Sequence, residues 1–389
     1  MKTKSKIPAL RFKGFTDAWE QRKLSEGTSK IGDGLHGTPN YSDNGDVFFI
    51  NGNNLVNGKI VITKETKLVT ESNQSKDDKL LNRDTILMSI NGTIGNLAWY
   101  NNERVMLGKS AAYLTVSNFD KKFIFSYLQT STIKNYFLNN LTGTTIKNLG
   151  LKTIRDTTLF VPTLEEQQKI GSFFKQLDDT IALHQRKCDQ TKELKKTMLQ
   201  KMFPKKGERI PEIRFPEFTD EWEEKKLGEV VEREIKGKAK ANMQGTKSIY
   251  LETEYLNGGE TTFVDSDADI EEDDILILWD GSQAGTVYHG FFGALGSTLK
   301  AYRPKESGKF VYYQLVAHQE MIFQRYRTPN IPHVIKTFTD EFSVFTTSLS
   351  EQERIGNFFK HLDTLIALHQ SKCDSLKELK KTLLRQLFV

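Results

Sequence analysis

The sequence predicts an α+β protein of two similar halves, each a mixed, strand-rich domain followed by one long helix. Two observations carry this prediction. Residues 166–203 and 351–388 are identical at 25 of 38 positions, and residues 6–26 and 209–229 at 12 of 21. Each half therefore opens on the same signature and closes on the same helix. This pattern indicates one duplicated unit with an internal pseudo-twofold repeat, because its period is far longer than that of a solenoid.

The predicted organisation has four parts in chain order. A first domain covers residues 1–163, a first long helix 164–206, a second domain 207–349 and a second long helix 350–389. The repeat interval is 203 residues at the opening signatures and 185 at the helices, so the second middle segment is 18 residues shorter. The two middle segments also diverge in sequence while both ends match.

Each middle segment has the β-branched and aromatic content of strands bounded by Asn and Gly turns. The expected strands are Val47–Ile50, Ile60–Thr63, Thr85–Ile90 and Ala111–Val116, and in the second half Ser248–Leu251, Asp274–Trp279, Thr286–Tyr288 and Leu299–Tyr302. In both halves one apolar strand runs into a tight-turn dipeptide, Asn91-Gly92 or Asp280-Gly281. One amphipathic helix is expected near the end of each domain, at about 122–138 and 309–324.

The repeated helices have predicted starts and a continuous seam. Thr163-x-x-Glu166 and Ser348-x-x-Glu351 match the capping box, in which the Glu side chain reaches back to the cap. Heptad-like spacing predicts a coiled-coil seam. The seam residues are Ile170, Phe174, Leu177, Ile181, His184, Cys188, Met198 and Met202, and then Ile355, Phe359, Leu362, Ile366, His369, Cys373, Leu376, Leu383 and Leu387. We expect the two helices to pair antiparallel, because about 145 residues between them let the chain return.

The centre of each seam carries a His and a Cys four residues apart, on one helical face. Antiparallel pairing would bring His184, Cys188, His369 and Cys373 together, and such a set matches the ligands of a tetrahedral zinc site. A small thiol and a polar residue that sets the register are also ordinary in a helix seam. We therefore expect core packing and no metal, with a zinc site as the alternative.

Charge is distributed unevenly along the chain. The net charge is +5, but residues 1–164 carry about +8 and residues 207–349 about −9. A basic balance is typical of nucleic-acid binding, although it decides little at this chain length. The acidic segment Asp265–Asp274 is expected to be a solvated loop rather than a metal site.

Several protein classes are disfavoured. The longest apolar run, Ile275–Trp279, is too short to cross a bilayer, and the N-terminus lacks the apolar stretch of a secretion signal, so a cytoplasmic protein is expected. The two cysteines are expected to be reduced there. No nucleophile elbow, phosphate-binding loop or other convincing catalytic set occurs.

Candidate DNA-contacting residues lie in polar loops at equivalent places in the two halves. The segments Thr142–Asn148 and Arg327–His333 are 185 residues apart and just precede the last strand before each helix. Asn and Gln side chains read adenine, Arg and Lys read guanine or hold phosphates, and Ser and Thr serve either. The candidates are Asn91, Thr93, Thr144, Thr145, Lys147, Asn148, Ser282, Gln283, Lys300, Arg303, Arg325, Tyr326, Arg327, Asn330 and His333.

The order of these elements resembles the specificity subunit of type I restriction-modification systems. The resemblance rests on the opening signature I-P-x-[LI]-R-F-x-x-F-T-x-x-W and on helices that begin E-Q-x-[KR]-I-G-x-F-F, each present twice, and it covers the whole chain. It implies that both domains are target recognition domains, each reading one half of a bipartite DNA sequence. It also implies that the helices form an antiparallel coiled coil that spaces the half-sites.

The resemblance further implies the partners of the chain. Two methyltransferase (M) subunits would dock on the helices, and restriction (R) subunits would join for cleavage of double-stranded DNA. The chain itself would be non-catalytic and hold no cofactor, while partner subunits would bind S-adenosylmethionine, ATP and Mg. The adenine methyltransferase motif Asn-Pro-Pro-Phe/Tyr and the Walker loop are both absent from the sequence.

Two other classes remain as alternatives. A protein scaffold would use the same domains and helices to bind proteins, and an autonomous nuclease or methyltransferase would need the catalytic set that is missing. A DNA-reading role also sets an orientation, because the DNA surface needs local positive charge. We expect Asp265–Asp274 to face away from the duplex, and Lys300, Arg303, Arg325 and Arg327 to cluster on the DNA side.

Overall fold

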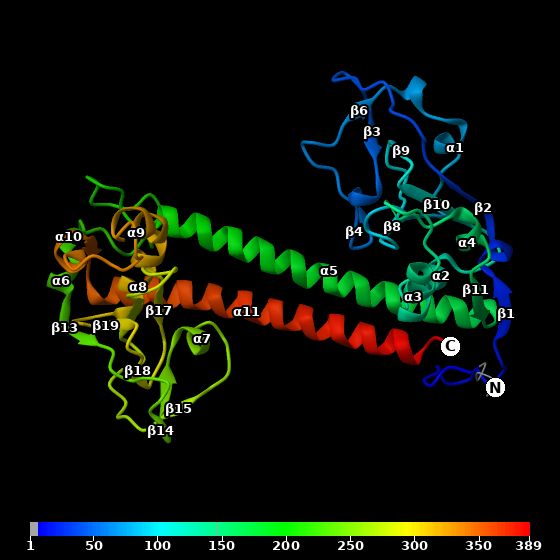
Figure 1. The fold of residues 1–389 in the computed structure, drawn as a ribbon. Coiled ribbons are helices and arrows are strands. Elements are labelled where there is room, and N and C mark those ends of the chain that lie inside the picture. The colour runs from blue at the N-terminus through cyan, green and yellow to red at the C-terminus, as the bar shows by residue number, and fades with distance from the viewer. Residues whose placement is uncertain (1–6, 146) are drawn as a thin grey trace. The chain divides into compact units, whose positions relative to one another are not determined.

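The computed structural model describes residues 7–145 and 147–389 and divides into two compact units (Figure 1). Unit 1 holds the described residues up to His184 together with Lys372–Val389, and unit 2 is Gln185–Ser371. The long helices are α5 (Leu164–Lys201) and α11 (Leu349–Gln386). Each unit therefore contains one strand-rich domain, the first part of one long helix and the last part of the other.

Unit 1 is built on a four-stranded antiparallel sheet in the order β2-β10-β7-β8. Its strands are β2 (Thr28–Asp33), β7 (Thr85–Ser89), β8 (Leu97–Trp99) and β10 (Ala111–Val116). A three-stranded sheet β6-β3-β9 and two antiparallel strand pairs complete the unit. These strands are β3 (Val47–Ile50), β6 (Leu68–Val69), β9 (Val105–Leu107), β1 (Glu20–Lys23) paired with β11 (Thr158–Val161), and β4 (Leu55–Val56) paired with β5 (Lys59–Ile60).

Unit 2 repeats this topology with a four-stranded sheet in the order β13-β19-β16-β17. Its strands are β13 (Val231–Lys236), β16 (Ile275–Leu278), β17 (Val287–His289) and β19 (Leu299–Pro304). The other strands are β14 (Gln244–Leu251), β15 (Phe263–Val264) and β18 (Ala294–Leu295), which form a three-stranded sheet, and β12 (Glu223–Lys226) paired with β20 (Ser343–Thr346). The duplication predicted from the ends of each half thus extends through the divergent middles.

Short helices connect the strands in both units. In unit 1 they are η1 (Leu24–Gly27), η2 (Gly52–Asn54), η3 (Glu71–Asn73), α1 (Lys76–Lys79), α2 (Lys121–Tyr127), α3 (Ser131–Asn139) and α4 (Leu151–Arg155). In unit 2 they are α6 (Leu227–Val230), α7 (Thr253–Leu256), α8 (Gly308–Ala317), α9 (Gln319–Arg325) and α10 (Phe338–Glu341). Within the described residues, no helix is both long enough and apolar enough to span a membrane.

The prediction of one amphipathic helix near the end of each domain is wrong, because each is two helices. In unit 1 the Thr130 hydroxyl accepts a hydrogen bond from the Ile133 amide and caps a new helix, α3, after α2 has ended. In unit 2 His318 stands between α8 and α9 with a ψ of 15°, outside the helical range. Of the strand expected at Ile60–Thr63, only Ile60 lies in a strand, the two-residue β5.

In unit 1 the opening signature, the start of α5 and the end of α11 share one core. The Trp19 ring, 1% exposed, packs edge-on against Phe123 of α2 and Phe388, with ring centroids 5.9 and 6.3 Å apart. Phe388 also lies 5.7 Å from Phe174 of α5. Lys380 pairs with Asp178 at 2.6 Å, so the two helix segments run antiparallel within this unit.

Unit 2 builds its core in the same way from the opposite helix ends. Trp222, fully buried, packs against Phe203 and Phe310 at centroid distances of 6.2 and 5.4 Å. Phe203, which follows α5, stacks on Phe359 of α11 at 5.9 Å, again with antiparallel segments. Trp222 and Phe203 are the repeat counterparts of Trp19 and Phe388, so the matched ends of the two halves are the residues that mount each domain on the helices.

The glutamate that opens each long helix binds the signature arginine and does not complete a capping box. Arg11 Nε and Nη2 donate to the two carboxylate oxygens of Glu166, both at 2.7 Å, and Arg214 binds Glu351 at 2.7 and 2.8 Å. Both glutamates are 0% exposed. The Thr163 hydroxyl still lies 3.4 Å from the Glu166 amide, so only that half of the predicted box is present. A buried carboxylate needs such a partner, and the arginine supplies two charge-assisted hydrogen bonds.

Candidate nucleic-acid interface

In unit 1 the turn that follows β7 meets the loop that precedes α4. Asn91 forms a β-bridge with Asn148, and the Leu149 amide donates to the Ile90 carbonyl at 2.9 Å. Thr142 and Asn148 exchange backbone hydrogen bonds of 2.9 and 2.8 Å, which close the loop between them. Residue 146 of this loop lies outside the described residues. Two segments that the sequence presented separately are thus one surface, here named site 1, containing 91–93, 142–145, 147 and 148.

Positive backbone angles help to shape site 1. Gly92 has a φ of 72°, which favours glycine at the turn. Among the predicted contact residues, Thr93, Thr144, Thr145 and Lys147 are exposed, and Asn91 and Asn148 are half-buried. The Asn91 side-chain oxygen is buried and has no hydrogen-bond partner among the described residues. The surface therefore presents amide, hydroxyl and ammonium groups, which are the groups that read base edges and hold phosphates.

Unit 2 places the equivalent turn and loop together in the same way. Asp280 forms a β-bridge with His333, and the Gly281 amide donates to the Pro332 carbonyl at 3.0 Å. Arg327 Nη2 donates to the Ser282 carbonyl at 2.7 Å, which ties the loop to the turn a second time. We name this surface site 2, containing 279–283 and 327–333.

A hollow adjoins site 2, and Trp279 within the site contacts Lys300. The hollow has a volume of about 700 Å³ and is lined by residues 253, 254 and 257–259 of the α7 region, Leu278 and the turn 280–283. Lys300 Nζ sits 3.6 Å from the centre of the Trp279 ring, and it also binds Glu234 at 2.6 Å. Trp279 was missed from the sequence, although its place between an apolar strand and a Gly turn is a detectable signal.

The remaining predicted residues of unit 2 fall into two groups. Ser282, Gln283, Arg325 and Asn330 are exposed, while Arg327 and His333 are half-buried within the site. Tyr326 instead packs edge-on against Phe338 and Phe342 at centroid distances of 5.4 and 5.5 Å, and this burial raises the pKa of its phenol. The structure therefore gives the Tyr326 ring a packing contact with the core of unit 2.

The expected separation of Arg303 from the acidic segment is wrong. Arg303 Nε and Nη2 donate to the carboxylate of Asp274 at 3.0 and 2.8 Å, and Nη1 lies 3.1 Å from Glu271. These bonds raise the pKa of the Arg303 guanidinium further. Asp274 is 1% exposed, so the arginine neutralises a buried carboxylate and its charge is already matched inside unit 2.

The acidic segment is also more ordered than a solvated loop. Asp269 accepts a hydrogen bond from the Leu295 amide at 2.8 Å, and Asp273 accepts one from the Gly308 amide at the start of α8, also at 2.8 Å. Burial opposes the charged form of Asp273, but bonds from His289 and Gly308 outweigh it and hold the pKa below its usual value. Three aspartates of this segment therefore fix the sheet and α8 in place.

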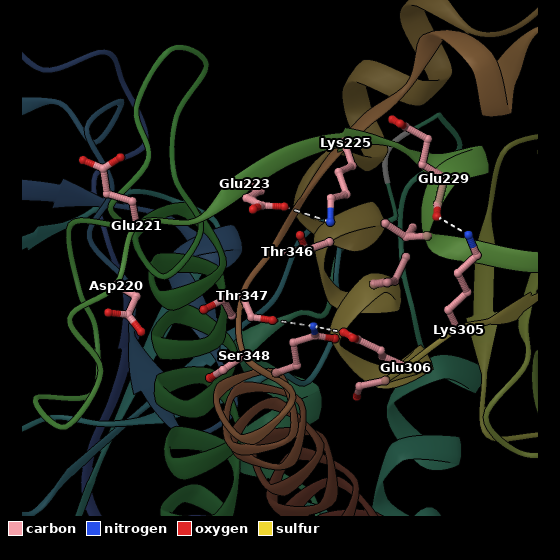
Figure 2. Close-up of a pocket in the computed structure, with 14 residues that line it drawn as sticks. Asp220, Glu221, Glu223, Lys225, Glu229, Lys305, Glu306, Thr346, Thr347 and Ser348 are labelled. Carbon is pink, nitrogen blue, oxygen red and sulfur yellow. Dashed lines mark hydrogen bonds and ion pairs between the residues drawn. The ribbon is translucent and has the colours of Figure 1, made fainter.

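A separate cavity in unit 2 is acidic and shares no lining residue with site 2. Its volume is about 320 Å³, and Figure 2 shows its lining side chains. Five carboxylates and two lysines surround it: Asp220, Glu221, Glu223, Glu229, Glu306, Lys225 and Lys305. Lys225 binds Glu223 at 2.9 Å and lowers the pKa of that carboxyl, and Lys305 donates to the Glu229 carbonyl at 2.7 Å. The excess of negative charge disfavours DNA here.

The seam residues lie where each helix faces the other within its own unit. All of the predicted seam positions from Ile170 to Cys188 and from Ile355 to Cys373 are buried or half-buried. Cys188 Sγ lies 3.8 Å from the Ile366 carbonyl, and Cys373 Sγ lies 3.9 Å from the Ile181 carbonyl, so each thiol contacts the backbone of the facing helix. Over the described ranges 7–145 and 147–389, no group of three or more His, Cys, Asp or Glu side chains is arranged to hold a metal ion.

Two related polar surfaces on matched mounts, with different side chains at corresponding positions, define a duplicated recognition protein. The chain belongs to the type I restriction modification DNA specificity domain family, whose model matches residues 17–193 and 219–378. The first matched segment contains site 1, and the second contains site 2.

Two individual proteins illustrate the similarity. The chain is 29% identical over 194 residues to the type I restriction enzyme MjaVIII specificity subunit of Methanocaldococcus jannaschii. The aligned residues are 47% of this chain and 45% of that protein. The alignment therefore spans less than half of that relative. The S subunit of a type I restriction-modification system from M. genitalium has the same fold, with a TM-score of 0.71 and 18% identity over 98% of this chain and 99% of that one.

Proposed function

We propose that this chain is the DNA sequence-specificity subunit of a type I restriction-modification complex, in which sites 1 and 2 each read one half of a bipartite target. The observation that carries the proposal is the equivalence of the two sites. In site 1 the turn after β7 meets the loop before β11, and in site 2 the turn after β16 meets the loop before β20. β7 and β16 occupy the same position in their four-stranded sheets. Their side chains differ, with Asn91 and Asn148 in one and Asp280 and His333 in the other.

The chemistry of each site suits base readout. Site 1 offers Asn and Thr side chains, and Asn pairs with adenine through two hydrogen bonds. Site 2 adds Arg327 and Gln283, which suit guanine and adenine. Arg325 and Lys147 are exposed and suit phosphate contacts, which position a protein on the duplex without reading sequence. Arg303 and Tyr326 are left out of the proposed contact set because their groups are engaged inside unit 2.

The long helices supply the proposed docking positions for two methyltransferase subunits and the spacing of the half-sites. Exposed leucines recur on them with the repeat interval. Unit 1 carries Leu183 and Leu379, which are 44% and 48% exposed, and unit 2 carries their counterparts Leu368 and Leu194, at 59% and 44%. Contiguous exposed apolar surface is typical of protein contacts, and these leucines would contribute to such a surface. One equivalent pair in each unit suits two copies of one partner.

The chain is proposed to be non-catalytic and cytoplasmic. S-adenosylmethionine would be bound by the methyltransferase subunits, and ATP and Mg by partner subunits including the restriction subunits. The chain's own residues bind and orient the double-stranded DNA, and the side chains at sites 1 and 2 select the sequence. The chemistry on the bases belongs to the partners.

Methylation mapping tests the proposal. The chain would be expressed with its methyltransferase, and methylated adenines would be located by sequencing. The expected result is one split motif. Exchanging residues 27–162 for the corresponding segment of another family member should change one half of that motif and leave the other half unchanged.

The matched control exchanges residues 230–347, the equivalent segment of the second half, and should change the other half-motif only. An unaltered motif after either exchange, in a complex that still methylates DNA, would contradict the specificity role. That outcome would favour a scaffold, in which the domains bind proteins and the methyltransferase reads the sequence itself.

A further inference from the structure

Ile331 is an unusual side chain for the tip of a polar loop. It is 78% exposed, more than any of the other large hydrophobic residues that stand out from the described surface. It lies between Pro329 and Pro332 in site 2, and its immediate neighbour Asn330 is exposed. An isoleucine left in water on a surface of hydrogen-bonding groups contributes nothing to the core of unit 2.

The loop holds Ile331 outward by a dense set of hydrogen bonds. The Thr328 amide donates to the His333 carbonyl at 3.0 Å, and the His333 amide donates to the Thr328 hydroxyl at 3.2 Å. The Thr328 hydroxyl donates to the Ile331 carbonyl, and His333 Nδ1 lies 3.0 Å from the same carbonyl. The flanking prolines have fixed φ angles, which reduces the conformational freedom of the loop further. The exposure of Ile331 is therefore built into the loop.

The same loop is fixed to the turn of site 2. The Gly281–Pro332 hydrogen bond of 3.0 Å and the Arg327–Ser282 bond of 2.7 Å anchor both of its sides. Ile331 thus projects from the surface that also carries Ser282, Gln283 and Asn330. A pre-organised side chain loses little entropy on binding, so its contact adds directly to affinity.

We propose that Ile331 determines specificity in site 2 by packing against the 5-methyl group of a thymine in the major groove. The inference rests on the proposed DNA-reading function. Among the base edges of the major groove, the thymine methyl is the one apolar feature, while the others are hydrogen-bond donors and acceptors. An exposed aliphatic group among amide, hydroxyl and guanidinium groups matches that pattern. The neighbouring polar residues would read the donors and acceptors of adjacent bases.

The experiment replaces thymine by uracil, which removes only the methyl group. The chain in complex with its methyltransferase subunits would be titrated with duplexes that contain the mapped motif, each thymine being changed to deoxyuridine in turn. The expected result is that one substitution in the half-site read by unit 2 weakens binding about fourfold, the value of one buried methyl group. The Ile331→Ala variant should bind the thymine duplex more weakly and no longer discriminate thymine from uracil at that position. The four affinities of the two proteins for the two duplexes form a double-mutant cycle.

Ile210→Ala is the matched control, because Ile210 is also exposed in unit 2, at 52%, but belongs to the opening signature and lies outside site 2. It should retain the fourfold discrimination. Both variants should keep the wild-type melting temperature, since neither side chain is buried. Uracil substitutions in the half-site read by unit 1 should change the affinity equally in wild type, Ile331→Ala and Ile210→Ala.

Three results would overturn the inference while leaving the specificity role intact. One is a half-site for unit 2 without thymine on either strand, and another is equal uracil discrimination in wild type and Ile331→Ala. The third is weaker binding by Ile331→Ala without any uracil effect in the wild type, which would assign the side chain to a wedge between base pairs. Failure of the wild-type complex to bind the mapped motif specifically would instead contradict the proposed function.

Discussion

The buried arginine–glutamate pairs explain why two distant sequence motifs match in both halves. Arg11 and Arg214 come from the opening signature, and Glu166 and Glu351 come from the start of each long helix. An unpaired carboxylate at 0% exposure would be costly, so neither motif can change alone. The pair ties the chain that enters a domain to the helix that leaves it, and this link is needed in both units.

Replacing Arg214 by Leu should destabilise the protein. The change leaves the Glu351 carboxylate buried with only the Thr347 hydroxyl and the helix start as partners, so the expected loss in the free energy of unfolding is about 3 kcal/mol. Urea denaturation followed by circular dichroism measures it.

Arg209→Leu is the control for that measurement, since it removes a pair of the same type from the same signature. Arg209 and Glu221 are 68% and 64% exposed and 3.4 Å apart, so the expected loss is below about 1 kcal/mol. Equal losses in the two variants would show that burial does not set the strength of the Arg214 pair.

At the level of elements, the glycine of each helix motif permits a close crossing. A Cβ atom on Gly171 of α5 would lie 2.5 Å from the Phe123 amide nitrogen at the start of α2. The residue before Gly171 is the buried Ile170, and the motif begins with Glu166 and Gln167. The motif therefore combines a charge partner, a buried side chain and a gap for the backbone of α2.

Gly171→Ala should destabilise unit 1, because a Cβ at that distance from backbone forces α2 to move. A loss of about 1–3 kcal/mol is expected from overpacking, despite the better helix propensity of alanine. The counterpart Gly356→Ala meets Lys309 Cβ at 2.9 Å and the Phe310 amide only at 3.4 Å, so it forces a smaller shift and should lose less stability than Gly171→Ala. Thermal unfolding of the two variants side by side tests the difference. A Gly356→Ala variant that loses as much as Gly171→Ala would contradict it.

For the whole molecule, the two sequence repeats and the strand-rich segments between them were sufficient to predict the two-domain α+β fold and the paired helices. The bounds of β3 and β10 also follow from the sequence alone, because each is a short apolar run between turn residues. The contacts between segments did not follow. Arg303 and Asp274 are 29 positions apart, and their pairing depends on the register of β16 and β19.

The candidate sites were predicted as separate loops and turns, and their meeting was not. Asn91 and Asn148 come together because the end of β7 lies beside the loop that precedes α4. Hydrophobic patterns record which side of a strand is buried but not which loop crosses its end. Ile331 was missed for a related reason, since an isoleucine between two prolines is as typical of a core turn as of an exposed tip.

Each unit takes one aromatic residue from the far end of a long helix, which leads to a prediction for the whole chain. Phe388→Ala should destabilise unit 1, where the ring contacts Trp19, Phe123 and Phe174, by about 3–5 kcal/mol. Hydrogen exchange should quicken in α2 and remain unchanged in α8.

Phe203→Ala, the repeat counterpart, should have the reverse effect and quicken exchange in α8 only. Equal quickening of α2 and α8 by either variant would show that the two units unfold as one.

The composition of unit 1 has a consequence for the order of synthesis. Unit 2 is one continuous stretch, Gln185–Ser371, whereas unit 1 needs residues 372–389 to complete its core. On a ribosome residues 7–184 emerge before unit 2, but the Trp19 and Phe174 rings lack their Phe388 contact until residues 372–389 have also emerged. Unit 1 therefore completes its core after unit 2, and during that interval its exposed apolar surface makes it dependent on chaperones.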